Sequence, residues 1–90
     1  MPAKVHIHKT HRPFTSGLEE VEVEGNTVGE CLNQLVKRFP EMEKAIFAKK
    51  DKLRNNVEIY LNQASAYPNE LVKTVRDGDE IHLVVMLTGG

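Results

Sequence analysis

The chain has 90 residues, 40% of them hydrophobic, which suffices for one small domain with a single core but leaves little room for an elaborate active site. Twelve basic and 13 acidic side chains give a formal net charge of −1, which argues against a dedicated nucleic-acid binder. The single cysteine, Cys31, excludes an internal disulfide and fits a reducing compartment. Because no stretch resembles a signal peptide or reaches the length of a membrane span, we expect a cytoplasmic protein without a membrane partner.

Two segments near the N-terminus alternate between polar and apolar residues, as strands with one buried face do. They cover residues 4–9 and 18–24, and the polar stretch between them is punctuated by proline and glycine. On the first strand, His6 and His8 share the face opposite to the core. The core-facing residues of that strand are Val5 and Ile7. This pattern predicts a hairpin with a long loop.

The main helix is predicted to begin at Thr27. Thr27 and Glu30 have the spacing of a capping box, in which the hydroxyl caps the helix and the glutamate reaches back to the N–H of Thr27. Apolar residues then recur at helical spacing as one continuous stripe. The stripe consists of Val28, Cys31, Leu32, Leu35, Val36 and Phe39. Pro40 ends the helix because residues that precede proline avoid the α region.

Three further elements are predicted in the second half of the chain. They are a short helical turn within residues 41–50, a strand at residues 57–61 and a last strand at residues 80–87. The polar segments 51–56 and 62–69 are expected to be loops. Asp77-Gly78-Asp79 is a turn signal, since glycine tolerates a positive φ, and it leads into the last strand.

The order strand, strand, helix, strand, strand predicts an α+β domain in which one helix covers one face of one sheet. The open face of such a sheet should be polar, but apolar side chains alternate onto both faces of the last strand. Its inward residues are Ile81, Leu83, Val85 and Leu87. Its outward residues are His82, Val84 and Met86, which Tyr60 can join from the neighbouring strand. The outward set is a candidate docking patch, although a covering loop or a strand that is apolar throughout would give the same pattern.

The printed sequence ends in Thr88-Gly89-Gly90, directly after the last apolar strand. Glycine lacks a Cβ, so such an end can adopt nearly any backbone conformation and enter a channel too narrow for other residues. Two residues span about 7 Å, enough to bring a carboxylate into a partner's pocket. Termini are also often small and frayed, so the two glycines alone do not distinguish a reactive end from an idle one.

These features occur in the order found in the ubiquitin-like sulfur carriers (the ThiS/MoaD family), which the chain resembles along nearly its whole length. The matching details are Arg12-Pro13, Asn26-Thr27-Val28-Gly29, Tyr60-Leu61-Asn62, the segment Leu71 to Val75, Asp77-Gly78-Asp79 and Gly89-Gly90. Arg12-Pro13 followed by Thr15 and Gly17 is most similar to carriers that supply sulfur for cysteine biosynthesis in actinobacteria. Unlike many members, the chain has no proline pair before the diglycine, which leaves its partner open.

The resemblance implies a single β-grasp domain over residues 1–90, with a mixed sheet of four to five strands packed on one main helix and a flexible end at residues 88–90. An E1-like adenylating enzyme (MoeB/ThiF-like) is implied to activate Gly90 with ATP, after which sulfur replaces AMP to give a thiocarboxylate. The carrier is then not an enzyme and binds no cofactor, and a sulfur-acceptor synthase uses the sulfur. The residues implied to contact these partners are Gly89, Thr88, Leu87, Met86, Val84, His82 and Tyr60.

In the β-grasp pattern the first and last strands pair, which brings His82 near His6 and His8. Three imidazoles can ligate Zn²⁺ or Cu²⁺. Because the spacing fixes no additional thiolate or carboxylate, we favour solvent-facing or partner-contacting histidines and assign no metal. Cys31 lies on the apolar stripe of the helix and is expected to be a buried, unreactive thiol.

Two other functions stay open at this point. A ubiquitin-like modifier would begin with the same adenylate, but a lysine amine would attack Gly90 and form an isopeptide bond. A non-covalent β-grasp interaction module would leave the diglycine unused. Among carriers, the cysteine, homocysteine, molybdopterin and thiazole pathways use similar proteins, and the sequence contains no acceptor pocket that separates them.

Overall fold

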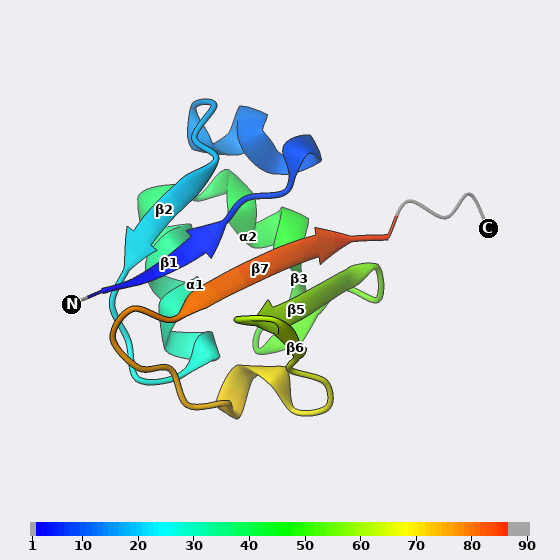
Figure 1. The fold of residues 1–90 in the computed structure, drawn as a ribbon. Helices are drawn as coiled ribbons and strands as arrows, with labels where there is room; N and C mark the ends of the chain where they lie inside the picture. The colour runs from blue at the N-terminus through cyan, green and yellow to red at the C-terminus, as the bar shows by residue number, and fades with distance from the viewer. Residues whose placement is uncertain (1, 87–90) are drawn as a thin grey trace.

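The structure, a computed structural model, describes residues 2–86, and residues 1 and 87–90 lie outside this description. Its main component is a mixed sheet with the strand order β2-β1-β7-β5-β6 (Figure 1). The strands are β1 (Ala3–His6), β2 (Glu20–Val23), β5 (Val57–Leu61), β6 (Ala64–Ser65) and β7 (Glu80–Val85). β1 and β7 run parallel, whereas the other neighbouring strands are antiparallel. The predicted pairing of the first and last strands is confirmed.

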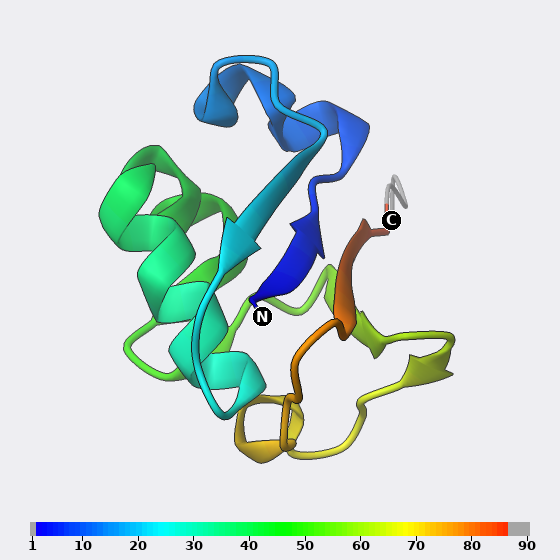
Figure 2. The same ribbon diagram turned by 60° about the vertical axis from the view of Figure 1, so that its left-hand side comes forward.

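Helices cover one face of this sheet, as Figure 2 shows. The remaining elements are α1 (Val28–Arg38), α2 (Glu41–Ile46), the 3₁₀ helices η1 (Lys9–Thr15) and η2 (Glu70–Val72), and a separate hairpin of β3 (Phe47–Lys49) and β4 (Lys52–Leu53). No helix within residues 2–86 is long and apolar enough to cross a membrane. The predicted α+β architecture, a β-grasp sheet on one main helix, is confirmed.

The N-terminus of α1 is capped by the residues that the sequence indicates, with one difference. The N–H of Glu30 donates to Oγ1 of Thr27 over 3.1 Å. The carboxylate of Glu30 accepts from the N–H of Asn26 over 2.7 Å, one residue earlier than the predicted Thr27. At the other end, the N–H of Phe39 donates to the carbonyl of Leu35, and the chain turns directly into α2.

The core lies between α1 and the covered face of the sheet. Four residues of the predicted stripe are fully buried: Val28, Cys31, Leu32 and Leu35. Val36 and Phe39 are partly buried against the same core. Burying a leucine side chain stabilises a fold by roughly 1.5–3 kcal/mol, so this stripe is a main source of the attachment of α1 to the sheet. From the last strand, Ile81 and Leu83 are buried as predicted, and Val85 is half-buried.

The first predicted strand is too long. β1 ends at His6, and His8 instead caps η1 by accepting a hydrogen bond at Nδ1 from the N–H of Thr10 over 3.2 Å. Residues 10–17, predicted as a loop, are largely 3₁₀ helix, in which Thr15 is buried and donates to the carbonyls of neighbouring residues. This change separates His8 from the sheet face that His6 occupies.

Two pieces of sheet differ from the prediction, because β3 lies within the predicted helical turn of residues 41–50, and β4 and β6 lie in segments predicted as loops. The β3–β4 hairpin occupies part of residues 47–53, and β6 forms a tight turn with β5 through Asn62, which has a φ of 58°. Asparagine tolerates this left-handed conformation better than most residues. The turn before β7 is confirmed, with Gly78 at a φ of 85°. β7 ends at Val85, and the predicted strand residue Leu87 lies outside the described residues.

Candidate functional site

The four described residues of the predicted docking patch lie together on the open face of the sheet. Tyr60 on β5 is the partner of His82 on β7, and Glu58 is the partner of Val84. Directly opposed residues of an antiparallel pair project to the same face, so Tyr60, His82 and Val84 form one surface. All three are half-buried, and Met86, which follows β7, is 40% exposed. No segment among residues 2–86 buries this patch completely.

Backbone hydrogen bonds hold the C-terminal end of β7 as far as Met86, the last described residue. The N–H of Met86 donates to the carbonyl of Asn56 over 2.8 Å, so β7 is fixed to the loop before β5 at this point. The remaining predicted site residues, Leu87, Thr88, Gly89 and Gly90, lie outside the described residues. Their roles stay predictions.

A pocket of about 600 Å³ lies beside Met86, lined by residues of β4, β5 and η2. Two of its apolar side chains are largely exposed, Tyr67 at 76% and Val72 at 71%. Tyr67 lies within the predicted polar loop of residues 62–69 and Val72 follows it, and no periodicity there associates either residue with the patch. Met86 therefore belongs to the docking patch and also lines this pocket.

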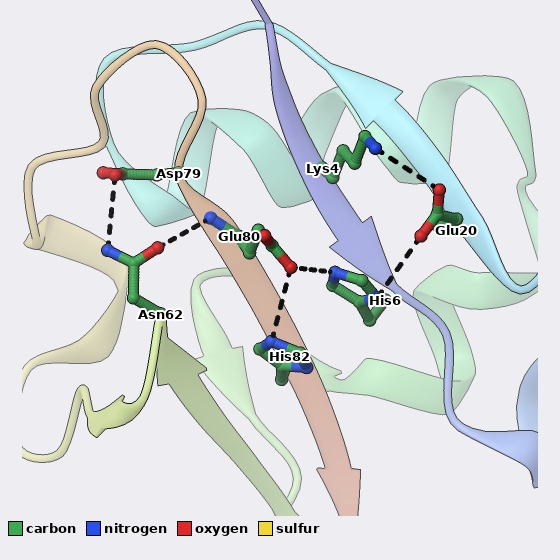
Figure 3. Close-up of polar contacts among 7 residues, drawn as sticks. All are labelled: Lys4, His6, Glu20, Asn62, Asp79, Glu80 and His82. Carbon is green, nitrogen blue, oxygen red and sulfur yellow. Dashed lines mark hydrogen bonds and ion pairs between the residues drawn. The ribbon is translucent and has the colours of Figure 1, made fainter.

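The histidine prediction is partly right. His6 and His82 are partners in the parallel pair of β1 and β7, and their rings stack with centroids 4.2 Å apart and planes 4° from parallel. His8 is not part of this group, because β1 ends before it. The carboxylate of Glu80 joins the two rings instead, with Oε1 lying 2.7 Å from Nε2 of His6 (Figure 3).

Glu80 was not predicted as a site residue, although its spacing of two from His82 indicates the same strand face. Its position depends on Asn62, whose side-chain Oδ1 accepts from the N–H of Glu80 over 3.0 Å. The amide nitrogen of Asn62 also donates to the carboxylate of Asp79 over 3.3 Å (Figure 3). The turn after β5 therefore holds the start of β7 in place.

Cys31 is buried, as predicted. Burial raises the pKa of its thiol, and the nearby carboxylate of Glu30 raises it further. Since the thiolate is the nucleophilic form, this cysteine is poorly suited to bind or transfer sulfur. The chemistry of a carrier would therefore need another group.

Known proteins resemble this chain in sequence pattern and in fold. A model of the ThiS family matches residues 5–90, whereas no curated protein matches the sequence. A chain of the Amycolatopsis orientalis BexX/CysO complex is 27% identical with a TM-score of 0.87, over 98% of this chain and 99% of the other. CysO of Mycobacterium tuberculosis is 24% identical with a TM-score of 0.86, over 94% and 99% of the two chains. Small archaeal modifier protein 1 (SAMP1) of Methanosarcina acetivorans is 25% identical with a TM-score of 0.86, over 98% and 95%.

Proposed function

The chain belongs to the ThiS family, and from this we propose that it is a sulfur carrier whose Gly90 carboxylate is converted into a thiocarboxylate. One observation supports the proposal above the others. The family match extends over residues 5–90 and thus includes both β7, which carries most of the docking patch, and the diglycine. The burial of Cys31 is consistent with it, because the cysteine is withdrawn from sulfur chemistry.

The proposed reaction follows from the poor reactivity of a free carboxylate, which is anionic and lacks a good leaving group. An E1-like partner transfers AMP from ATP to the Gly90 carboxylate and releases pyrophosphate. A sulfur nucleophile then attacks the acyl carbon and displaces AMP, which leaves the thiocarboxylate. Docking of the carrier converts the attack of this sulfur on an acceptor into an effectively unimolecular step.

In this proposal the described face of the sheet selects the partners. Tyr60, Val84 and Met86 offer aromatic and apolar contact area, and His82 offers a polar contact at its border. Aromatic and methionine side chains are enriched in protein interfaces. The similar Amycolatopsis orientalis chain comes from a structure described as a complex of BexX and CysO, which supports the expectation of a partner protein.

We propose that the sulfur is used in the biosynthesis of a sulfur-containing amino acid or cofactor: cysteine or homocysteine, molybdopterin, or thiazole. Each of these acceptors requires its own synthase. Incubating the thiocarboxylated chain with one synthase at a time identifies the acceptor, because only the matching enzyme consumes the thiocarboxylate. The Gly90 sulfur attacks the acceptor and forms a thioester, and water then cleaves the bond between the Gly90 acyl carbon and sulfur, which restores the carboxylate and releases a sulfur-containing product.

Protein modification is the second candidate, and one observation favours it. The similar protein from Methanosarcina acetivorans is named a small archaeal modifier protein. A modifier would use the same Gly90 adenylate, but a lysine amine of a target would displace AMP and form an isopeptide bond. The two functions therefore differ in the nucleophile, and one experiment can compare them.

The test incubates the tag-free chain with an E1-like enzyme, ATP and sulfide, followed by an alkylating reagent and intact-mass analysis. The carrier function predicts an ATP-dependent exchange of one oxygen for sulfur that then accepts one alkyl group more than Cys31 accepts in the reaction without ATP. Alkylation is needed because a methionine sulfoxide also adds about the mass of one oxygen but is not alkylated under these conditions. A parallel reaction adds a cell extract as a source of target proteins. High-mass conjugates of the chain there, without the sulfur exchange, would favour the modifier. An unchanged mass of the chain with several cognate enzymes would refute both functions.

A further inference from the structure

Two histidines and one glutamate converge on the open face of the sheet, where β1 and β7 run parallel. His6 and His82 are register partners on these strands, and Glu80 precedes His82 by two residues. Side chains two apart on a strand share a face, so the backbone itself brings the three groups together. Figure 3 shows one nitrogen of each ring turned toward the Glu80 carboxylate.

The distances among the three groups are close to those of a metal site. Oε1 of Glu80 lies 2.7 Å from Nε2 of His6 and 3.9 Å from Nε2 of His82. One ligand atom from each of the three residues lies within 4.8 Å of the others. Around a tetrahedral zinc ion with bonds of about 2.0–2.2 Å, ligand atoms lie roughly 3.3–3.5 Å apart. The two observed separations fall on both sides of that value. Because the rings of His6 and His82 stack with planes 4° from parallel, binding requires the rings to tilt until both lone pairs point at one ion.

A second layer of polar groups orients these ligands. The other ring nitrogen of His6, Nδ1, lies 3.6 Å from a carboxylate oxygen of Glu20, and Lys4 lies 3.5 Å from the second oxygen of that carboxylate (Figure 3). Metal-bound histidines almost always direct their free ring nitrogen at such a carboxylate or a carbonyl. Asn62 fixes the backbone of Glu80 from the other side.

We propose that His6, His82 and Glu80 bind one divalent transition-metal ion of the zinc class through two imidazole nitrogens and one carboxylate oxygen. The side chains of the three residues are 29%, 40% and 50% exposed, respectively, so water completes the coordination. Two histidines and one glutamate with an open position are a known zinc ligand set. The ion takes the place of the direct contact between His6 and Glu80. This inference does not depend on sulfur transfer.

The experiment is a calorimetric titration of the tag-free 90-residue chain with zinc chloride, since a polyhistidine tag would itself bind the ion. We expect saturation at one ion per chain. His82→Gln and Glu80→Gln should each weaken binding by more than about tenfold, because even second-layer changes cost 10–100-fold. Glu20→Gln should weaken it about tenfold for that reason.

The matched control is His8→Asn, which removes a nearby histidine outside the cluster and keeps an acceptor for the N–H of Thr10. It should bind zinc as the parent chain does. Nuclear magnetic resonance of the parent chain needs no variant: zinc should shift the ring signals of His6 and His82 and leave those of His8 and His11 unchanged. The proposal is overturned if the parent chain does not saturate, if His82→Gln binds equally well, or if zinc shifts only the rings of His8 or His11.

Discussion

Tyr60 and His82 lie directly opposite each other across the antiparallel strands β5 and β7. The next pair on the same face, Glu58 and Val84, lies nearer to the end of β7, and Met86 follows. The docking patch is therefore a surface of two strands that extends to the C-terminal end of β7. Its residues are positioned by the ladder between β5 and β7, so single side chains can be changed without removing the backbone contacts.

A charge in the docking patch should weaken partner binding. We expect Met86→Asp to lower the kcat/KM of the E1-like enzyme for this carrier by at least about tenfold, mainly through KM, because a desolvated interface position would receive an unpaired charge. The measurement is the initial rate of ATP-dependent pyrophosphate release at several carrier concentrations.

Leu18→Asp is the matched control for that change. Leu18 is 43% exposed, close to the 40% of Met86, but it precedes the edge strand β2. The account predicts that this control keeps the parent kcat/KM. Equal losses in both variants would show that any exposed apolar residue matters and would contradict a localised docking patch.

Cys31 should react slowly in the folded chain. Burial and the Glu30 carboxylate raise the pKa of the thiol, so at pH 7 the folded chain should be alkylated at least about tenfold more slowly than the chain in denaturant. Mass spectrometry over a time course measures both rates. Equal rates would mean that Cys31 is open to solvent and can compete with the terminus for sulfur.

His11 should make the fold sensitive to acid. Burial lowers its pKa below the usual 6.5, His8 lowers it further, and Nδ1 has no hydrogen-bond partner among the described residues. Because the unfolded chain then binds the proton more tightly, stability is complete above pH 6.5 and falls as the pH drops from there toward the folded-state pKa. Urea unfolding between pH 7.5 and 5 should show this decline.

The variant His11→Leu separates that effect from general acid destabilisation. Leucine cannot titrate, so the decline just below pH 6.5 should become shallower than in the parent chain. The same pH slope in both chains would assign the acid sensitivity to other groups.

The cap of α1 should contribute measurably to stability. Thr27→Ala removes the oxygen that accepts from the N–H of Glu30 and should cost about 1 kcal/mol of unfolding free energy. Thr27→Ser keeps that oxygen and should cost clearly less. Chemical denaturation of the three chains measures the difference, and an equal loss for serine and alanine would show that the methyl group rather than the hydrogen bond matters.

The sequence predicts the elements in which apolar residues recur at regular spacing over five or more residues. The stripe of α1 and the alternation of β5 and β7 identify those elements almost residue by residue, because each buries one face. β6 and β4 have two residues each, too few to show a period, and they form through pairing with neighbours. The 3₁₀ helix at residues 9–15 is short and mostly polar, so its sequence resembles a loop.

The candidate site was predictable where strand alternation determines it. The shared face of Tyr60, His82 and Val84 follows from alternation once the pairing of β5 and β7 is known. Glu80 was not predicted because it is the first residue of β7, although the same alternation places it on the face of His82. The inclusion of His8 was wrong, because the sequence alternates beyond the point where β1 actually ends.

The most direct test of the carrier function locates the sulfur within the chain. After reaction with the E1-like enzyme, ATP and sulfide, the chain is alkylated and digested with trypsin, and cleavage after Arg76 yields residues 77–90, which contain no cysteine. Tandem mass spectrometry should find the alkylated sulfur on the fragment that carries Gly90. Sulfur found only on the peptide with Cys31, or an unaltered Gly90 fragment beside an oxidised Met86, would contradict the proposed thiocarboxylate.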